Sequence, residues 1–385
     1  MDISIDKKEL VKALTAVCRT AAKKTRRNLD GECAVEIDAR IHGGASFRVV
    51  TFDARVDYPI HCATHVYGAA AVEAHTLLEA VRAQPDGDVR LVATRAHLHV
   101  NERAMILSRI LEMEPNPAPS RTFRIPAPLL TSALGDVAYA ISSEETRYYL
   151  NGVCLHATPS SLDAVATDGR QLAAVALPLP RGAEGTSMII PAQAVREIIK
   201  LWSKSTDMLT IGVSMSHMRI EGSGGICYET RLINGTYPNY ERVIPIPGHI
   251  PPLDGIEANP VLMTINRQAM LDAVKDMLAA GDQKAVISTK CLITDAGRVS
   301  MVLVGERGVE LCASVTLDCD AKMRHPAVEL GINPHYLIGT LSHIKGNSVK
   351  VWFADPGSPM LFAGDPGARH VVMPMRVPAP TRAKK

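Results

Sequence analysis

The stretch ISIDKKELVKAL, residues 3–14, contains the building unit of this 385-residue chain. Apolar and polar residues alternate over its first positions, which is the period of a half-buried strand. Asp6 interrupts this alternation, and the apolar residues after it recur with helical spacing. The stretch therefore predicts a strand that ends at a capping residue and continues directly into an amphipathic helix.

The same pattern of strand, cap and helix returns twice along the chain. Residues 123–134 read FRIPAPLLTSAL and residues 263–274 read MTINRQAMLDAV, with Pro126 and Asn266 at the position of Asp6. A second unit, an apolar residue before a short amphipathic helix, recurs at residues 72–81, 190–199 and 332–341. A third echo pairs VTFDAR at 50–55 with VATDGR at 165–170. Coordinated repeats in one order indicate three copies of a single domain.

Short alternating stretches separated by turn residues lie between the predicted helices, and these predict antiparallel hairpins. We therefore expect an α+β fold in which each domain packs two helices on antiparallel sheets. Two proline-rich segments mark the boundaries, so the predicted domains are residues 1–121, 122–252 and 253–377. Residues 378–385 are expected to form a disordered basic tail.

Tandem domains of this kind leave strand edges that must pair with something. Pairing between domains would extend the sheet, and repeated pairing closes into a ring or grows into a filament. Local basic clusters suggest what a ring would surround, because the net charge of the whole chain is only +2. One cluster is Lys23, Lys24, Arg26 and Arg27, and the other is Arg196, Lys200 and Lys204 at helical spacing. Both are suited to non-specific contact with phosphates, although the solvated face of a helix would show the same pattern.

Composition and motifs argue against several other classes of protein. Hydrophobic residues make up 46% and aromatic residues 4%, so the cores are expected to be aliphatic. The eight cysteines form no CxxC pair, and His61 with His65 is the nearest approach to a metal-ligand spacing. The N-terminus is charged, and there is no apolar run of about 18 residues. We expect a soluble cytoplasmic protein that is not an enzyme, requires no cofactor or metal and contacts no membrane.

Four segments resemble a known family. TRYYLNGVCLHA at 146–157, VATDGRQLA at 165–173, LINGTYPNYERVIP at 232–245 and HVVMPMRV at 370–377 are similar to the beta subunit of bacterial DNA polymerase III, the sliding clamp. The three-domain layout agrees with this family over residues 1–377. The resemblance implies a processivity factor that encircles duplex DNA without reading its sequence. It also implies a head-to-tail homodimeric ring of six domains, loaded by a clamp loader.

The resemblance further implies that the polymerase III alpha subunit and other clamp-motif proteins dock a short peptide between domains 2 and 3. Aliphatic and methionine walls would hold leucine or phenylalanine anchors, and a few polar groups would orient the peptide. The family's pocket positions correspond to Leu150, Thr167, Gly169, Arg170, Leu172, Pro238, Arg242, Val243, Asn333, Tyr336, Val371, Val372, Met373, Pro374, Met375 and Arg376.

The resemblance assigns other positions to DNA and to the dimer. Lys24, His75, Tyr148 and Tyr149 correspond to DNA contacts, although the two tyrosines would equally suit half-buried strand positions. The dimer contact corresponds to Met277 and Leu278 on one edge and to Ile106, in the segment 105–110, on the other. Apolar residues at 277 and 278 could instead belong to a core.

Several positions depart from the family pattern. Gln171 replaces a basic residue, Glu144 replaces a neutral one and would repel phosphate, and Gly357 and Pro359 change the pocket rim. The tail 378–385 extends past the usual end of the family and could cover the pocket or contact DNA. These departures leave an alternative open: a clamp-like decoy or specialised duplicate that binds clamp partners but is not a general replication clamp.

Overall fold

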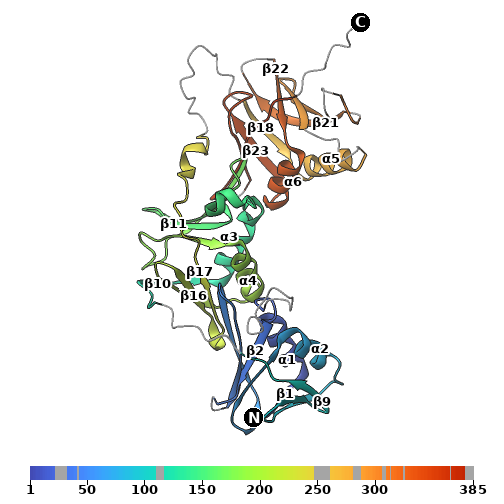
Figure 1. The fold of residues 1–385 in the computed structure, drawn as a ribbon. Helices are drawn as coiled ribbons and strands as arrows, with labels where there is room; N and C mark the ends of the chain where they lie inside the picture. Colours follow the sequence, from blue (N-terminus) through green and yellow to red (C-terminus); the bar gives the residue numbers. More distant parts are fainter. Residues whose placement is uncertain are drawn as a thin grey trace. The chain divides into compact units, whose positions relative to one another are not determined.

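The computed structural model describes residues 1–21, 33–40, 43–109, 117–246, 261–280, 288–305, 309–312, 314–323, 326–364 and 366–377 (Figure 1). The chain forms two compact units. The first contains Met1–Ser132 and Leu179–Asn234, and the second contains Ala133–Pro178 and Gly235–Lys385. Each unit therefore combines residues from two of the predicted domains. The boundaries of the three domains stay predictions.

The order of elements repeats three times. The first copy has β1 (Asp2–Asp6), α1 (Lys7–Val17), β2 (Ala34–Asp38), β3 (Gly44–Val50), β4 (Ala54–His61), β5 (Ala63–Val66), β6 (Ala69–Glu73), α2 (Ala74–Arg82), β7 (Asp88–Ala93), β8 (His97–Val100) and β9 (Arg103–Ile106). The second has β10 (Arg121–Pro126), α3 (Ala127–Val137), β11 (Gly152–Ala157), β12 (Ser161–Thr167), β13 (Gln171–Pro178), β14 (Ser187–Pro191), α4 (Ala192–Trp202), β15 (Met208–Val213), β16 (His217–Glu221) and β17 (Cys227–Arg231). The third has β18 (Val261–Asn266), α5 (Arg267–Ala280), β19 (Ser288–Thr294), β20 (Arg298–Val304), β21 (Val315–Lys322), β22 (Ala327–Ile332), α6 (Pro334–His343), β23 (Ser348–Phe353), β24 (Met360–Ala363) and β25 (Ala368–Val372).

The predicted strand, cap and helix units are confirmed. The Asp6 carboxylate accepts hydrogen bonds from the backbone amides of Lys8 at 2.9 Å and Glu9 at 3.1 Å, so it caps α1. Asn266 accepts from the amide of Ala269 at 2.9 Å at the start of α5. These side chains satisfy amides that have no partner within the helix. At each of these capping residues the local sequence ends a strand and begins a helix, as the predicted α+β class requires.

The strands pair in antiparallel fashion, and the pairing continues from one repeat to the next. In the first unit one sheet has the order β10-β15-β16-β17-β4-β3-β2-β6, and a smaller one has β5-β1-β7-β8-β9. In the second unit the order is β11-β12-β13-β25-β24-β23-β18-β21-β20-β19-β22. We name the β4–β17 pair the first junction and the β13–β25 pair the second junction. The expectation that pairing between repeats extends the sheet is confirmed.

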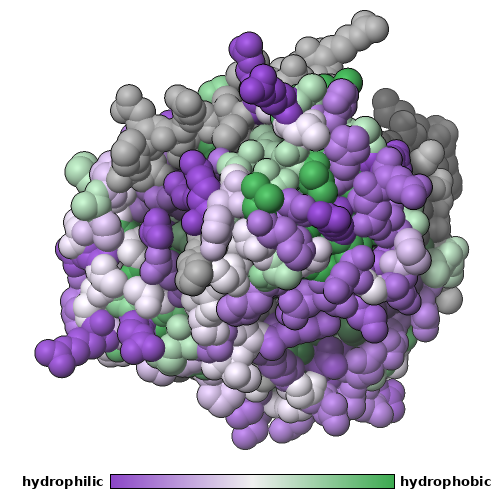
Figure 2. Space-filling model, turned by 90° about the horizontal axis from the view of Figure 1, so that it is seen from below, coloured by the Kyte–Doolittle hydropathy of each residue, from purple (hydrophilic) through white to green (hydrophobic). Residues whose placement is uncertain are grey.

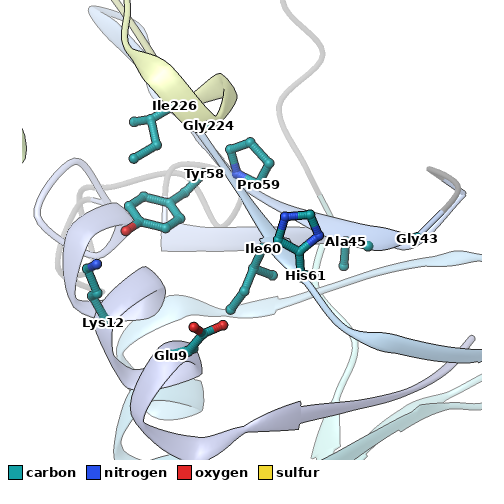
Figure 3. A pocket seen from close by; sticks show the side chains of 11 residues that line it. Glu9, Lys12, Gly43, Ala45, Tyr58, Pro59, Ile60, His61, Gly224 and Ile226 are labelled. Carbon is teal, nitrogen blue, oxygen red and sulfur yellow. The ribbon is translucent and has the colours of Figure 1, made fainter. Parts of the chain in front are cut away.

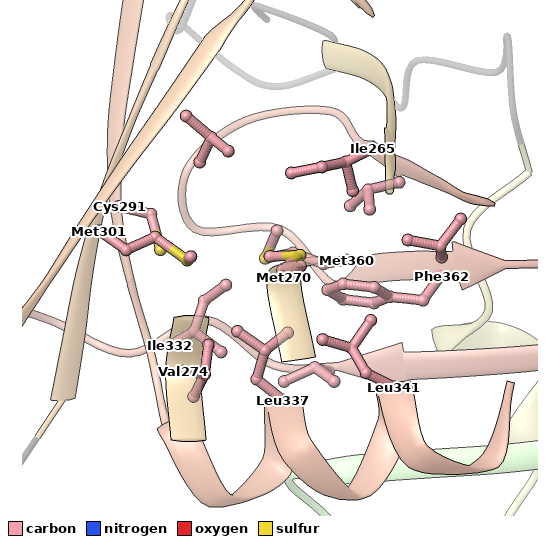
Figure 4. Close-up of a cluster of buried hydrophobic side chains, with 14 of the residues drawn as sticks. Ile265, Met270, Val274, Cys291, Met301, Ile332, Leu337, Leu341, Met360 and Phe362 are labelled. Carbon is pink, nitrogen blue, oxygen red and sulfur yellow. The ribbon is translucent and has the colours of Figure 1, made fainter. Parts of the chain in front are cut away.

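The buried core of the third repeat is aliphatic, as its composition predicts. Figure 4 shows Met270 and Val274 of α5 and Leu337 and Leu341 of α6 converging with Phe362 of β24. The two helices lie side by side against the sheet, as do α1 and α2 in the first repeat (Figure 1). Methionine and aliphatic side chains fill the space that few aromatic residues are available to fill.

One face of the molecule is drawn in Figure 2. On the face drawn in Figure 2, hydrophilic residues predominate and apolar residues appear as small separate areas. Within the described residues, none of the helices is both long and apolar enough to cross a membrane.

Candidate functional site

The site is centred on a tight turn between β12 and β13. The Asp168 carboxylate accepts from the backbone amides of Arg170 at 2.8 Å and Gln171 at 2.9 Å. The Thr167 hydroxyl donates to the carbonyl of Gln171 at 2.6 Å and accepts from the amide of Gly169 at 3.1 Å. These bonds fix the backbone of the turn. The Thr167 hydroxyl therefore stabilises the turn.

Beside this turn the second unit contains a pocket of about 280 Å³. Its lining includes many of the predicted positions: Leu150, Thr167, Gly169, Arg170, Leu172, Pro238, Val243, Val371 and Met373. Segments far apart in the chain supply them, namely the 3-10 helix Glu145–Leu150, the β12–β13 hairpin, the 238–243 segment and the end of β25. A pocket of this size with a mainly apolar lining fits one or two side chains of an extended peptide.

The floor of the pocket follows from strand pairing. Leu172 of β13 lies opposite Val371 of β25, and Val371 lies opposite Leu361 of β24. All three side chains belong to one buried cluster. Val372, the next residue along β25, points to the other face of the sheet and joins the core of the third repeat. Alternation along the strand therefore separates two neighbouring residues that the prediction placed in one pocket.

Several predicted pocket residues lie beside the pocket and have other contacts. Asn333 caps α6 by accepting from the amide of His335 at 2.9 Å. A hydrogen bond to Tyr336 is the main cause that raises the pKa of Arg170 above its usual value. Arg242 lines an adjoining groove. The remaining three, Pro374, Met375 and Arg376, follow the end of β25. The Met375 amide donates a hydrogen bond to the Gly331 carbonyl at 2.9 Å.

The structure adds pocket residues that the prediction missed. They are Arg147, Tyr149, Gln171, Asn239 and Tyr240. The resemblance assigns Tyr149 to a DNA contact, whereas in the structure Tyr149 lines the pocket. Asn239 and Tyr240 lie inside the NYERV motif, so the motif itself was the available signal.

Arg147 secures one side of the pocket. Its guanidinium forms an ion pair with Glu144 at 2.7 Å and donates to the Asp168 carbonyl at 3.0 Å. A Cβ at Gly169 would lie 2.5 Å from the Arg147 Nη1 atom, and Gly169 has φ of +87°, so glycine suits this position for two reasons. The hydrogen bond from Arg147 lowers the pKa of Glu144. The charge of Glu144 is thus balanced by Arg147, and the expected repulsion of phosphate is reduced.

A buried polar network supports the pocket from the side of Tyr240. The Tyr240 hydroxyl donates to Asp163 Oδ2 at 3.2 Å, and Arg369 Nη2 donates to the same oxygen at 2.9 Å. The Ser161 hydroxyl donates to Asp163 Oδ1 at 2.6 Å. Burial, followed by the nearby Asp163 charge, raises the pKa of Tyr240. The phenol therefore remains a neutral donor that satisfies a buried carboxylate.

The basic stripe on α4 is exposed. Arg196 and Lys200 lie on the helix, and Lys204 lies just past its end. Glu197, the acid within this stretch, is buried. Its oxygens accept from Thr20 Oγ1 at 2.6 Å and from Gln193 Nε2 at 2.5 Å. The three cations therefore face solvent without this acid beside them.

The other predicted DNA contacts differ in their placement. Tyr148 is exposed, with its ring 5.9 Å from that of Tyr149 in an edge-to-face arrangement. His75 lies in the first turn of α2. Lys23, Lys24, Arg26 and Arg27 lie outside the described residues, as do residues 378–385.

The predicted dimer residues fall into two classes. Ile106 is 79% exposed on β9, an edge strand. Met277 and Leu278 are 2% and 6% exposed and belong to the core of the third repeat. The alternative that they are core residues agrees with this burial, and their part in a dimer contact stays a prediction.

A second hollow, of about 330 Å³, lies in the first unit. Figure 3 shows Glu9 and Lys12 of α1 projecting toward Tyr58 and Ile60 of β4, with His61 at its edge. Within the part of the chain that the structure describes, no three His, Cys, Asp or Glu side chains are grouped in a way that could hold a metal ion.

Three comparisons relate this chain to known proteins. Residues 124–239 match the family model of the DNA polymerase III beta subunit, central domain. A beta sliding clamp from Caulobacter vibrioides is 31% identical over 329 residues, which cover 81% of this chain and 83% of the relative. A beta sliding clamp from Escherichia coli is 24% identical over 328 residues, with the same coverage of both chains.

Solved structures agree in fold. A sliding clamp (DNA polymerase III subunit beta) from Bartonella birtlesii, bound to griselimycin, has a TM-score of 0.85 at 27% identity. It matches 98% of this chain and 100% of that chain. A DNA polymerase sliding clamp from Caulobacter crescentus gives a TM-score of 0.84 at 27% identity, with the same coverage.

Proposed function

We propose, from the premise that this chain belongs to the bacterial beta sliding clamp family, that it is a processivity factor that encircles duplex DNA. In this proposal it tethers the replicative polymerase and other partners through the pocket beside the Thr167–Gln171 turn. Its place of action is the cytoplasm, where the DNA and the polymerase are.

One observation carries the tethering part of the proposal. Leu172 of β13, together with Val371 and Met373 at the end of β25, lines a single pocket beside a turn whose backbone is fixed by hydrogen bonds. A preformed apolar pocket with a rigid edge suits an extended peptide, because little ordering is needed when the peptide binds. Leucine and phenylalanine anchors match the aliphatic floor.

The ring part of the proposal rests on the family and on the exposed cations of α4. Two copies joined head to tail would close the ring, with the edge strand β9 and the third repeat as the contacting regions. Contacts between lysine or arginine and phosphates are weak and exchange readily, so a closed ring can slide. Processivity then arises because the tethered polymerase remains at a high local concentration near the DNA. In this mechanism the protein binds, and it catalyses no reaction.

Topology provides the decisive test. Light scattering should give twice the 41.5 kDa chain mass. The protein, loaded by a clamp loader on a nicked circular plasmid, should stay bound in high salt and be released when the plasmid is cut. Retention that is unaffected by cutting the circle would contradict the encircling mechanism.

The basic stripe is tested with Arg196→Ala, Lys200→Ala and Lys204→Ala combined. For each phosphate that the variant no longer neutralises, the slope of log affinity against log salt should become shallower by about 0.9. The matched control replaces three exposed cations elsewhere, Arg95, Arg181 and Lys350, with alanine. Equal effects of the two triple variants would show that α4 has no special part.

The same samples distinguish a clamp from a decoy. A decoy would bind a peptide with a leucine and phenylalanine anchor but would never be retained on circular DNA. A protein that neither binds the peptide nor stays on circles would contradict both functions.

A further inference from the structure

The apolar floor of the pocket continues beyond the pocket itself. The row of paired residues that contains Leu172, Val371 and Leu361 continues to Trp352 of β23, which lies opposite Leu361. The next residue in the row is Leu262 of β18. Paired residues in adjacent strands project to the same face of a sheet. A single apolar row therefore crosses five strands, and only its first part lies under the pocket described above.

A second groove, of about 380 Å³, lies over the Trp352 part of this row. One wall is the chain segment that leaves the 3-10 helix Tyr240–Val243 and runs to Ile246. The other wall contains Ser358 and Pro359. Val243 lines both this groove and the pocket, so the two hollows adjoin each other.

Both walls of the groove have a defined conformation. In the turn between β23 and β24, the Asp355 carboxylate accepts from the amide of Gly357 at 2.7 Å and from the Ser358 hydroxyl. The Asp355 carbonyl accepts from the Ser358 amide at 3.1 Å. On the facing wall, the Asn239 side chain accepts from the amide of Glu241 at 3.1 Å and starts the 3-10 helix. The groove is thus present before any ligand binds.

The rim of the groove exposes apolar side chains. Ile246 is 66% exposed and Val243 is 43% exposed, whereas Trp352 beneath them is 6% exposed. Covering the two exposed aliphatic side chains that line this groove with the tryptophan is favourable, because apolar surface leaves water. Glu241 and Arg242 at the edge provide one charge of each sign. A ligand for this groove therefore needs a bulky apolar side chain and no net charge at that point.

We propose that this groove binds the residues of a partner peptide that flank its anchor, so that the peptide runs from the pocket across Val243 and places a second apolar side chain over Trp352. This inference rests on the proposed tethering function and goes beyond it. It assigns a second recognition point to Trp352, Ile246 and Pro359. Partners that share the same anchor would then differ in affinity according to the residue that reaches this groove.

The test compares short synthetic peptides by fluorescence anisotropy. The core peptide carries a Leu-Phe anchor alone. Two extended pairs add a few residues before or after the anchor, with leucine or serine at the position expected to reach the groove. One leucine peptide should bind about tenfold tighter than its serine counterpart, the effect of burying one aliphatic side chain.

Variants locate this gain. Ile246→Ser should reduce the leucine-over-serine ratio to about one and leave the affinity for the core peptide unchanged. Met215→Ser, which alters an exposed apolar residue of the first unit, should change neither. If no extended pair shows a ratio above one, or if the ratio survives Ile246→Ser, the second recognition point is wrong. Failure of the core peptide to bind the unmodified protein would instead contradict the tethering function.

Tryptophan emission provides an independent readout. The chain has two tryptophans, and Trp202 is buried in the first unit. The leucine-extended peptide should change the emission of Trp352, and the core peptide should leave it nearly unchanged. Tight binding of the extended peptide without a change in emission would also overturn the proposal.

Discussion

The two junctions of this chain are built on the same backbone and differ in their side chains. At the first junction a short turn joins β3 to β4, and β4 pairs with β17. At the second junction a short turn joins β12 to β13, and β13 pairs with β25. The strands beyond them also correspond, since β16 and β15 follow β17 as β24 and β23 follow β25.

Corresponding positions can be compared along this shared frame. The row of the first junction reads Arg55, Glu229, Arg219 and Gly212. The row of the second junction reads Leu172, Val371, Leu361 and Trp352. Charged residues and a glycine therefore occupy the places of three aliphatic residues and a tryptophan.

The two rows have different coverings. The first is the floor of a smaller hollow of about 210 Å³, which the chain's own Pro117–Pro119 segment also lines. A Cβ on Gly212 would lie 3.2 Å from the Cβ of Pro119, so the chain's own segment lies close against this end of the row. The second row is apolar and open to solvent at the pocket. The backbone therefore creates two equivalent junctions, and the side chains give an apolar row to the second one and a charged row to the first.

Placing the charged row of the first junction at the second junction should have the largest effect on peptide binding. Leu172→Arg with Val371→Glu places the Arg55–Glu229 pair at the second junction. Peptide affinity should fall at least about a hundredfold, because two aliphatic side chains are removed from the floor and charges face the anchor. Titration of the anchor peptide by calorimetry measures this fall.

The control for this exchange is its mirror image. Arg55→Leu with Glu229→Val should leave peptide affinity unchanged. The milder Val371→Thr keeps the shape of the floor and should cost about tenfold in affinity, which guards against a variant that fails to fold. Full peptide affinity in the exchanged variant would show that the apolar row is not the binding floor.

Polar groups are also placed differently at the two junctions. Tyr240→Phe tests this difference, and its effect is expected to be of intermediate size. The second junction keeps its polar network buried beside the floor, where Asp163 accepts from Tyr240 and Arg369. Removing the hydroxyl leaves a buried carboxylate with one donor fewer, which should lower the free energy of unfolding by about 1–2 kcal/mol. Urea unfolding followed by Trp352 emission measures it. Tyr148→Phe, at an exposed site, should cost less than about 0.5 kcal/mol, and an equal cost for both would contradict the network's role.

Local signals were enough to predict the repeated elements. Asp6 and Asn266 mark helix starts because a side-chain oxygen is needed wherever backbone amides lack partners. Each predicted strand, cap and helix unit appears in the structure within a few residues. The specific junctions could not be predicted in this way, because periodicity states that a strand has a buried face and does not state which strand pairs with it. The β4–β17 pair joins residues far apart in the sequence.

The pocket shows the same limit at the scale of single residues. Motifs identified the segments that meet, and Leu172, Val371 and Met373 line the pocket as predicted. They did not give the direction of each side chain. Val372 points into the opposite core by strand alternation, and the Asn333 side chain caps a helix. Arg147 was missed because its role depends on the close approach of a glycine turn, which the sequence alone does not reveal.

The smallest effect concerns the ion pairs that Asp57 of β4 forms beside the charged row of the first junction. Asp57 forms ion pairs with Arg55, at 2.6 Å, and with Arg48, which also lies 3.2 Å from Glu36. Asp57→Asn leaves two guanidinium groups with less compensating charge and should lower the free energy of unfolding by about 1 kcal/mol at low salt. This cost should shrink at about 0.5 M salt, because these side chains are partly exposed and salt screens them. Urea unfolding at two salt concentrations measures both effects.

Glu221→Gln, which breaks the more exposed pair with Arg219, should change the free energy of unfolding by less than about 0.5 kcal/mol. If Asp57→Asn costs nothing at low salt, ion pairing does not stabilise the first junction, and its charges would have to be explained by the need to keep that row from binding apolar peptides.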